Sequence, residues 1–125
     1  MLETMELTGR AQFVALRRLR EVYPDMTILQ AMAFFYVAGN EGVPQKQVRE
    51  HLEAGADSTA SRILGMLADV GFRGTAGVGL ILFKNNPHDR RERLMYLSPK
   101  GKRLMASIMS DLNIKAEVGG SLEAV

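Results

Sequence analysis

Apolar residues recur every three or four positions through most of the first 70 residues, a spacing typical of amphipathic helices. The first such stretch predicts a helix from Thr8, a candidate N-cap, to Tyr23, because Pro24 then stops it. Its apolar stripe comprises Phe13, Leu16, Leu19 and Tyr23. A second helix is expected from Thr27 to about Ala38, and it is apolar on almost every side. We therefore place this second helix in the core.

Two further helices follow, separated by a break at residues 54–56. Pro44 suits the first turn of a short helix over 44–54, in which Val48 and Leu52 would face inward. The next helix would run from Asp57, as its cap, to Gly71. Its inward stripe is Ala60, Ile63, Leu64, Leu67 and Val70. Its opposite face carries Ser58, Thr59, Ser61, Arg62, Gly65 and Met66.

The period changes to that of strands in the next part of the chain. Residues 80–84 and 93–97 read as two strands, joined by the polar, basic segment 85–92. Ser98 and Pro99 then open a last helix. The expected fold is mainly α with a small β-hairpin (α+β), in one domain over 1–125. Its parts are an amino-terminal helix (8–23), a helix-turn-helix core (27–70), a hairpin (80–97) and a carboxyl-terminal helix (98–116) suited to dimerisation.

Composition narrows the chemistry. At 125 residues the chain suits a single core, and the absence of cysteine excludes disulfides, thiolate zinc sites and thiol nucleophiles. With only two histidines, we predict no metal site and no cofactor. No apolar run approaches the length of a membrane span, and the amino terminus lacks the order of a signal peptide. We therefore expect a soluble, cytoplasmic protein that contacts no membrane.

The positive charges are concentrated in one part of the chain. The formal net charge is only +2, but residues 71–105 carry eight cations against two carboxylates, a net of +6. The cations are Arg73, Lys84, Arg90, Arg91, Arg93, Lys100, Lys102 and Arg103. This distribution fits a surface for a polyanion, and it equally fits a solvated charged loop.

The order of elements is that of a winged helix-turn-helix domain. A helix fits the major groove of B-DNA, and a following hairpin with cations at its tip reaches the adjacent minor groove or backbone. The inserted helix needs an apolar back and a front of small or polar residues, since bulk would hold it out of the groove. Ser58, Thr59, Ser61 and Arg62 meet that need near the start of their helix.

On three segments the chain resembles the MarR family of transcriptional regulators. TILQAMAFFYVAGNEG is similar to the apolar helix before the motif, and PQKQVREHLEAGADSTASRILGMLADVGF is similar to the helix-turn-helix. NPHDRRERLMYLSPKGKRL resembles the wing, with its Asp-x-Arg tip and Ser-Pro-Lys-Gly helix opening. Together the three segments span residues 27–105, and the wing is the most specific of them.

The resemblance assigns roles to particular residues. Gln45 and Lys46 would lie near DNA phosphates, and Asp89 would orient Arg91 toward the minor groove. Arg90 and Arg93 would add backbone contacts. The implied DNA-binding set is Gln45, Lys46, Ser58, Thr59, Ser61, Arg62, Lys84, Asp89, Arg90, Arg91 and Arg93. The segment Gly74–Gly79 makes the approach to the wing longer than is usual in the family, so a different wing base or docking angle is an open expectation.

Two classes of function remain. The leading hypothesis is a homodimeric, sequence-specific regulator of transcription that binds double-stranded DNA. Members of the resembled family often bind small phenolic effectors, which leaves a small-molecule effector as an open alternative, but nothing in the sequence identifies a pocket for one. The alternative is a winged-helix module that contacts a protein, such as a polymerase or replication component, and binds DNA weakly. An enzyme is not expected, since the sequence shows no paired carboxylates, metal-ligand cluster or nucleophile with its base.

Overall fold

The computed structural model describes residues 2–53, 55, 57–68 and 77–113, and it divides the chain into two compact units. The larger unit covers Met26–Lys102, and the smaller one combines Met1–Asp25 with Arg103–Val125. The larger unit contains the elements that the sequence assigned to DNA binding.

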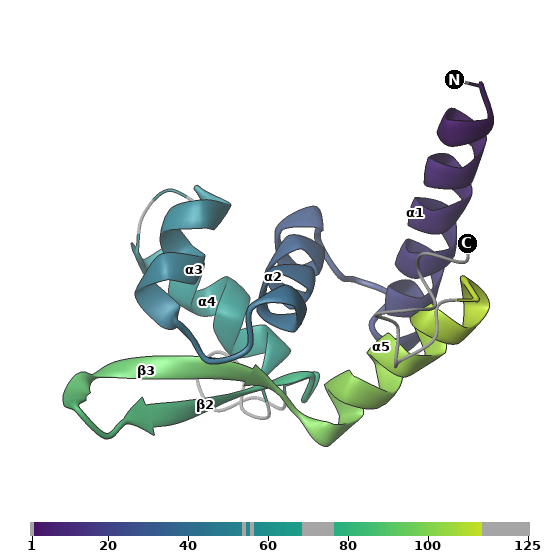
Figure 1. Ribbon diagram of the computed structural model, residues 1–125. Helices are drawn as coiled ribbons and strands as arrows, with labels where there is room; N and C mark the ends of the chain where they lie inside the picture. The colour runs from purple at the N-terminus through teal and green to yellow at the C-terminus, as the bar shows by residue number, and fades with distance from the viewer. Residues whose placement is uncertain (1, 54, 56, 69–76, 114–125) are drawn as a thin grey trace. The chain divides into compact units, whose positions relative to one another are not determined.

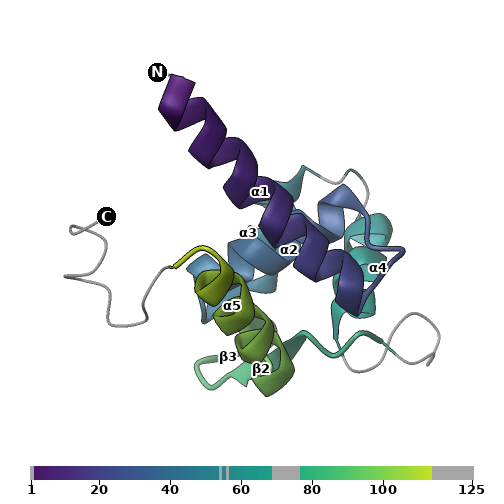
Figure 2. The same cartoon turned by 90° about the vertical axis from the view of Figure 1, so that its right-hand side faces the viewer.

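Among the described residues of the larger unit there are three helices and three strands, together with the start of a fourth helix, α5 (Figure 1). They are α2 (Ile28–Gly39), β1 (Val43–Pro44), α3 (Gln45–Leu52), α4 (Asp57–Leu67), β2 (Ile81–Asn86), β3 (Asp89–Leu97) and α5 (Pro99–Asp111). The strands form an antiparallel sheet in the order β1-β3-β2. Two views at right angles place α2, α3 and α4 on the same side of the β2–β3 hairpin (Figures 1 and 2). This is a mainly α fold with a small sheet, as predicted.

The core of this unit lies between the helices and the hairpin. Fully buried side chains come from every layer: Phe34 and Val37 of α2, Val48 of α3, Leu64 and Leu67 of α4, and Ile81 and Met95 of the hairpin. Burial of apolar surface on this scale is the main force that holds the layers together.

Helix α2 confirms its predicted cap and corrects its predicted environment. The Thr27 hydroxyl accepts a hydrogen bond from the backbone N–H of Gln30, and the Gln30 side chain accepts one from the N–H of Thr27, which makes a capping box. The expectation of burial all round is wrong on one side, because Ile28 is 79% exposed and Met32 45% exposed. An apolar composition alone does not determine which faces have neighbours.

The short strand β1 was not predicted. Val43 pairs with Met95 and Pro44 with Leu94, so β3 has a partner on each side. Pro44 precedes α3 as its N-cap in an extended conformation, and the prediction that it lies in the first helical turn is wrong. An edge position tolerates proline, which has no N–H to donate to the sheet.

The turn between α3 and α4 falls where the sequence placed it. Glu53 ends α3 in the left-handed region at φ 50°, and Gly55 follows with φ 84°. The described part of α4 ends at Leu67, short of the predicted Gly71; Val70 and Gly71 lie outside the described residues.

Backbone groups of the returning chain bind the carboxyl-terminal end of α4. The N–H groups of Val78, Gly79 and Leu80 donate to the carbonyls of Met66, Ala68 and Leu67, respectively. These bonds satisfy carbonyls that a helix end leaves without partners. They also join the end of α4 to the base of β2.

The hairpin is longer, and its turn tighter, than predicted. The expected loop over 85–92 consists mostly of strand, with the turn at Pro87–His88. Asn85 pairs with Arg93, but Asn86 pairs with Asp89, so the register shifts near the tip. Such an irregularity increases local twist and redirects side chains. Polarity alone suggested a loop because the tip strands are solvated on both faces.

Ser98 precedes α5 and caps it, as predicted, and Gly101 follows in the first turn of the helix. Its hydroxyl accepts a hydrogen bond from the N–H of Gly101 and donates one to the carbonyl of Gly79. A Cβ on Gly101 would overlap the carbonyl oxygen of Leu80 and lie 3.2 Å from its carbonyl carbon. Glycine is therefore required where α5 crosses the base of the hairpin.

The smaller unit contains α1 (Leu2–Val22) and the rest of α5. Because α1 begins at Leu2, Thr8 is an interior residue and the prediction that it is the N-cap is wrong. Residues 2–7, apart from Thr4, are good helix formers, and Glu3 in the first turn interacts favourably with the helix dipole. Described residues of α5 end at Asn113, so the predicted end at 116 lies outside them.

Helix α1 has a buried face and an exposed apolar face. Leu19 is buried, as predicted, whereas Phe13 is 64% exposed and Leu16 49% exposed, which corrects their predicted inward position. Next to Leu19, the partly exposed Arg18 guanidinium donates from Nε and Nη2 to the two carboxylate oxygens of Asp111 at 2.6 and 2.9 Å. This bidentate hydrogen bonding to Arg18 lowers the pKa of Asp111.

Candidate nucleic-acid interface

Helix α4 presents a small, polar face to solvent. Of its predicted inward stripe, Ala60, Leu64 and Leu67 are buried and Ile63 is half-buried, while Val70 lies outside the described residues. The residues predicted to contact DNA are all exposed: Ser58, Thr59, Ser61 and Arg62. Gly65 lies on the same side of the helix as Ser61, and an added Cβ there would meet no atom within 4 Å. This face can therefore approach a surface closely without a bulky side chain in between.

The two predicted phosphate contacts of α3 have different environments. Lys46 is exposed at the start of the helix. Gln45 is only 8% exposed, and its Oε1 accepts a hydrogen bond of 3.1 Å from Nε of Arg93. The side chain of Gln45 thus acts on another residue of the predicted set.

The tip of the hairpin is ordered by side chains that bind the backbone. Oδ1 of Asn86 accepts from the N–H of His88, and Oδ1 of Asp89 accepts from the N–H of Arg91 at 3.0 Å. The Arg91 guanidinium lies 3.7 Å from the same Asp89 oxygen and is 94% exposed. Nδ2 of Asn86 also donates to Oε1 of Glu92. Asp89 therefore shapes the turn that carries Arg91 and also pairs with its charge.

Two more cations of the hairpin rest on aromatic rings. Nζ of Lys84 lies 4.7 Å from the centre of the Tyr96 ring, and the guanidinium carbon of Arg93 lies 4.0 Å from the centre of the Phe83 ring. Cations over ring faces are stabilised and partly oriented. Arg90 is exposed beside Arg91 near the tip. Lys84 and Arg93 stand farther back along the strands.

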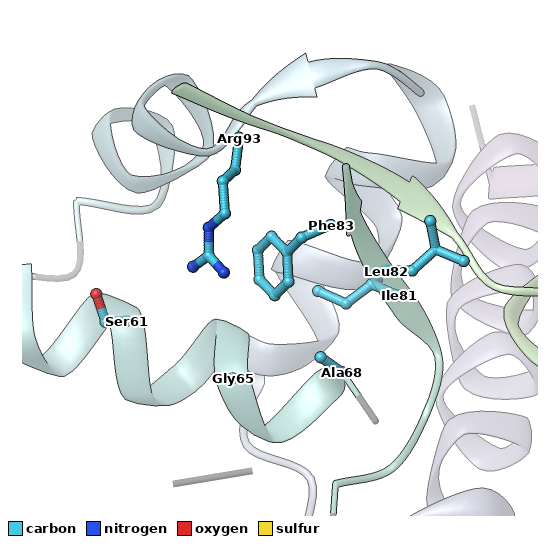
Figure 3. A pocket seen from close by; sticks show the side chains of 7 residues that line it. All are labelled: Ser61, Gly65, Ala68, Ile81, Leu82, Phe83 and Arg93. Atoms are coloured by element: carbon cyan, nitrogen blue, oxygen red, sulfur yellow. The ribbon is translucent and has the colours of Figure 1, made fainter. Parts of the chain in front are cut away.

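A hollow of about 390 Å³ separates α4 from the hairpin (Figure 3). Its walls come from α4, β2 and β3: Ser61, Gly65, Ala68, Ile81, Leu82, Phe83 and Arg93. Figure 3 shows Arg93 descending from β3 beside Phe83, with its guanidinium directed toward α4. The hollow thus connects the exposed face of α4 to the basic hairpin.

The described residues do not group as a metal site or as a membrane span would. Across 2–53, 55, 57–68 and 77–113, no three histidine, aspartate or glutamate side chains gather as metal ligands would. Within those ranges, no helix has both the length and the apolar character of a membrane span. Lys100, part of the basic stretch, donates to the carbonyl of Val78 and so supports the base of the hairpin.

Sequence reasoning missed the contact between Gln45 and Arg93. The two residues are 48 positions apart, and no local pattern connects them. The pairing of Pro44 with Leu94 brings residue 45 beside residue 93. The contact between Gln45 and Arg93 could have been predicted only if residues 43–44 had been recognised as a strand that pairs with β3.

Comparison with known proteins supports this fold. No family model matches the chain, and no curated protein matches it significantly. Solved structures do. The chain is 18% identical to the MepR of S. aureus in a MepR–DNA complex, with a TM-score of 0.61, over 99% of this chain and 95% of that one. It is 16% identical to RV1404 from Mycobacterium tuberculosis, with a TM-score of 0.63, over 98% and 77%.

A MarR transcriptional regulator from Methanosarcina mazei is also similar, at 20% identity and a TM-score of 0.57, over 87% of this chain and 73% of that one. Identities this low establish the fold alone. The chain has the winged-helix fold of the MarR-type transcriptional regulators. In that fold α3 and α4 form the helix-turn-helix, and the β2–β3 hairpin is the wing.

Proposed function

We propose that this protein is a sequence-specific, double-stranded-DNA-binding regulator of transcription. The observation that carries the proposal is the combination, within one unit, of the exposed polar face of α4 and the cationic tip of the wing. The likeness to a fold that has been solved bound to DNA supports it. We propose no catalytic activity and no cofactor.

In this proposal α4 enters the major groove. Ser58, Thr59 and Ser61 are short enough to let the helix approach base edges, and their hydroxyls both donate and accept. Arg62 adds a planar fork suited to the two acceptors of guanine. Lys46 at the start of α3 would contact the backbone beside the groove.

The wing enters the flanking minor groove. Arg91 is the group to insert, because it is 94% exposed at a tip whose turn Asp89 has already shaped. The narrow minor groove of A·T-rich DNA has an enhanced negative potential that attracts arginine. Arg90 and Lys84 would add contacts to the sugar-phosphate backbone.

We further propose that the regulator is a homodimer. Met5, Phe13 and Leu16 recur at helical spacing on one face of α1, and each is about half exposed or more. Exposed apolar residues grouped in this way mark a protein-binding surface. A two-fold dimer would read two half-sites about one helical turn apart.

Two further parts of the proposal rest on the function itself. A regulator of transcription acts where the chromosome is, so we propose that the protein lies in the cytoplasm. The small-molecule effector comes from the family resemblance, and a thermal-shift screen of small phenolic acids would test it.

Selection of bound sequences from a random duplex pool is the decisive experiment. The expected result is a near-palindromic motif bound as a dimer, with log K falling against log salt at a slope of about −5 for roughly six phosphate contacts. A monomer with only non-specific duplex affinity would reject the proposal and favour the protein-interaction alternative. Arg10→Ala, on the exposed surface of α1, is the matched loss-of-charge control and should bind normally.

A further inference from the structure

Arg93 occupies a position that the general proposal does not explain. Its guanidinium hangs into the hollow between α4 and the wing, opposite Ser61 and above Gly65 (Figure 3). Gly65 contributes no side chain, and an added Cβ would find open space there. The hollow is therefore a gap with a cation at one wall and a small hydroxyl at the other.

The guanidinium is held in place from two sides. Oε1 of Gln45 accepts a hydrogen bond of 3.1 Å from Nε of Arg93, and the centre of the Phe83 ring lies 4.0 Å from the guanidinium carbon. Because Gln45 uses Nε, the two terminal nitrogens of Arg93 point into the hollow (Figure 3). Gln45 itself is 8% exposed, so its acceptor is fixed by packing in α3. A side chain oriented in this way loses little entropy when it binds.

The shape of the duplex determines what would enter the hollow. In B-DNA one sugar-phosphate strand forms the ridge between a major groove and the adjacent minor groove. If α4 lies in the major groove and the wing tip lies in the adjacent minor groove, that ridge must cross the gap between α4 and the wing. The hollow between Ser61 and Arg93 is this gap.

We propose that the hollow binds one backbone phosphate of this ridge, with the terminal nitrogens of Arg93 and the hydroxyl of Ser61 as donors. Gln45 is a positioning residue that acts through Arg93 and does not itself touch DNA. This inference rests on the proposed function. It replaces the expectation that Gln45 contacts phosphate directly, and it gives Arg93 a defined partner.

The test measures binding of several duplexes of different sequence, each at several salt concentrations, since phosphate contacts do not depend on sequence. Arg93→Ala should weaken binding about tenfold or more and reduce the salt slope by about 0.9, the value of one phosphate. Arg93→Lys keeps the charge but places all its donors on one nitrogen, so it cannot donate to Gln45 from one nitrogen and to a phosphate from two others. It should retain most of the slope and lose affinity about threefold or more.

Gln45→Met, which keeps the length of the side chain and removes the acceptor, tests the positioning role. It should weaken binding about threefold in the wild-type chain and have no further effect in Arg93→Ala. An equal loss in both backgrounds would assign Gln45 to the fold alone and overturn that role. Melting temperatures measured alongside show that each variant is folded, and Arg10→Ala is the control.

The outcomes separate this inference from the proposed function. Wild-type protein that binds no duplex would overturn both. Wild-type binding with an unchanged affinity and slope in Arg93→Ala would overturn the phosphate site and leave the function standing. A loss confined to a few base sequences would assign Arg93 to base recognition and likewise reject the phosphate site.

Discussion

Two glycines in helices predict opposite responses to the same substitution. Alanine is more stable than glycine in a helix interior by up to about 1 kcal/mol, mostly through backbone entropy. Gly65 in α4 follows this rule, because no heavy atom lies within 4 Å of an added Cβ. Gly65→Ala should therefore stabilise the protein by as much as about 1 kcal/mol.

At Gly101 the same substitution by alanine is expected to destabilise the protein. The new methyl group would overlap the carbonyl oxygen of Leu80 and stand 3.4 Å from Cβ of Leu97. The oxygen cannot easily move away, since it accepts a hydrogen bond from the N–H of Ser98 at 3.0 Å. Overpacking against backbone costs about 1–3 kcal/mol, and the site in the first turn of α5 recovers little helix propensity. We expect Gly101→Ala to be destabilised by about 2 kcal/mol.

Thermal unfolding followed by circular dichroism checks both values in one experiment. For a chain of this length about 1 kcal/mol corresponds to about 4 °C, so Gly101→Ala should melt about 8 °C below the wild type. Gly65→Ala should melt up to about 4 °C above it. A Gly101→Ala protein as stable as the wild type would refute the close approach of α5 to the hairpin. A destabilised Gly65→Ala would refute the open space beside α4.

Four further predictions concern the interface and the smaller unit. Arg91→Ala should weaken binding and reduce the preference for A·T pairs beside each half-site in gel shifts; unchanged flank preference would contradict the wing assignment. Arg62→Ala should reduce discrimination among operator variants by about 1–3 kcal/mol at the contacted base, and equal losses on all sequences would assign it to phosphate instead. Phe13→Ser should shift the protein toward monomer in sedimentation, whereas an intact dimer would move the interface elsewhere. Asp111→Asn should lower stability at neutral pH. Because the pKa of Asp111 is lowered in the fold, the advantage of the wild type should be full above the unfolded pKa of about 3.9 and disappear as pH falls through the folded pKa. A difference independent of pH in urea titrations would exclude the pair with Arg18.

Much of this fold was predictable because its signals are local. The capping box of Thr27, the break at Gly55 and the Ser98 cap each depend on residues within one helical turn. The two-sided pattern of α4 likewise predicted that Leu64 and Leu67 are buried and that Ser58 and Ser61 are exposed, although Ile63 and Met66 are both half-buried. Such features follow from the geometry of the helix and need no knowledge of the rest of the chain.

The errors occurred where distant parts of the chain decide the outcome. A two-residue strand such as Val43–Pro44 has no period, and only its pairing with β3 defines it. Phe13 and Leu16 satisfy the spacing of a core stripe, but periodicity does not distinguish a face that packs within the chain from one left for a partner.

In the candidate site, too, local features could be predicted and contacts between distant residues could not. Ser58, Thr59 and Ser61 could be assigned to an exposed face from spacing alone. The environment of Gln45 could not, because its hydrogen bond to Arg93 depends on how β1 and β3 are aligned. The cations of the candidate site can be identified from the sequence, but the contacts that orient them depend on the tertiary fold.

The backbone bonds from Val78, Gly79 and Leu80 to the end of α4 have a practical consequence. All three bonds join backbone groups, so they do not depend on which side chain stands at position 78. The sequence contains no cysteine, so a single cysteine introduced at Val78 would be the only thiol available to a fluorescent label. Such a label would stand where α4 and β2 meet, with these bonds still in place.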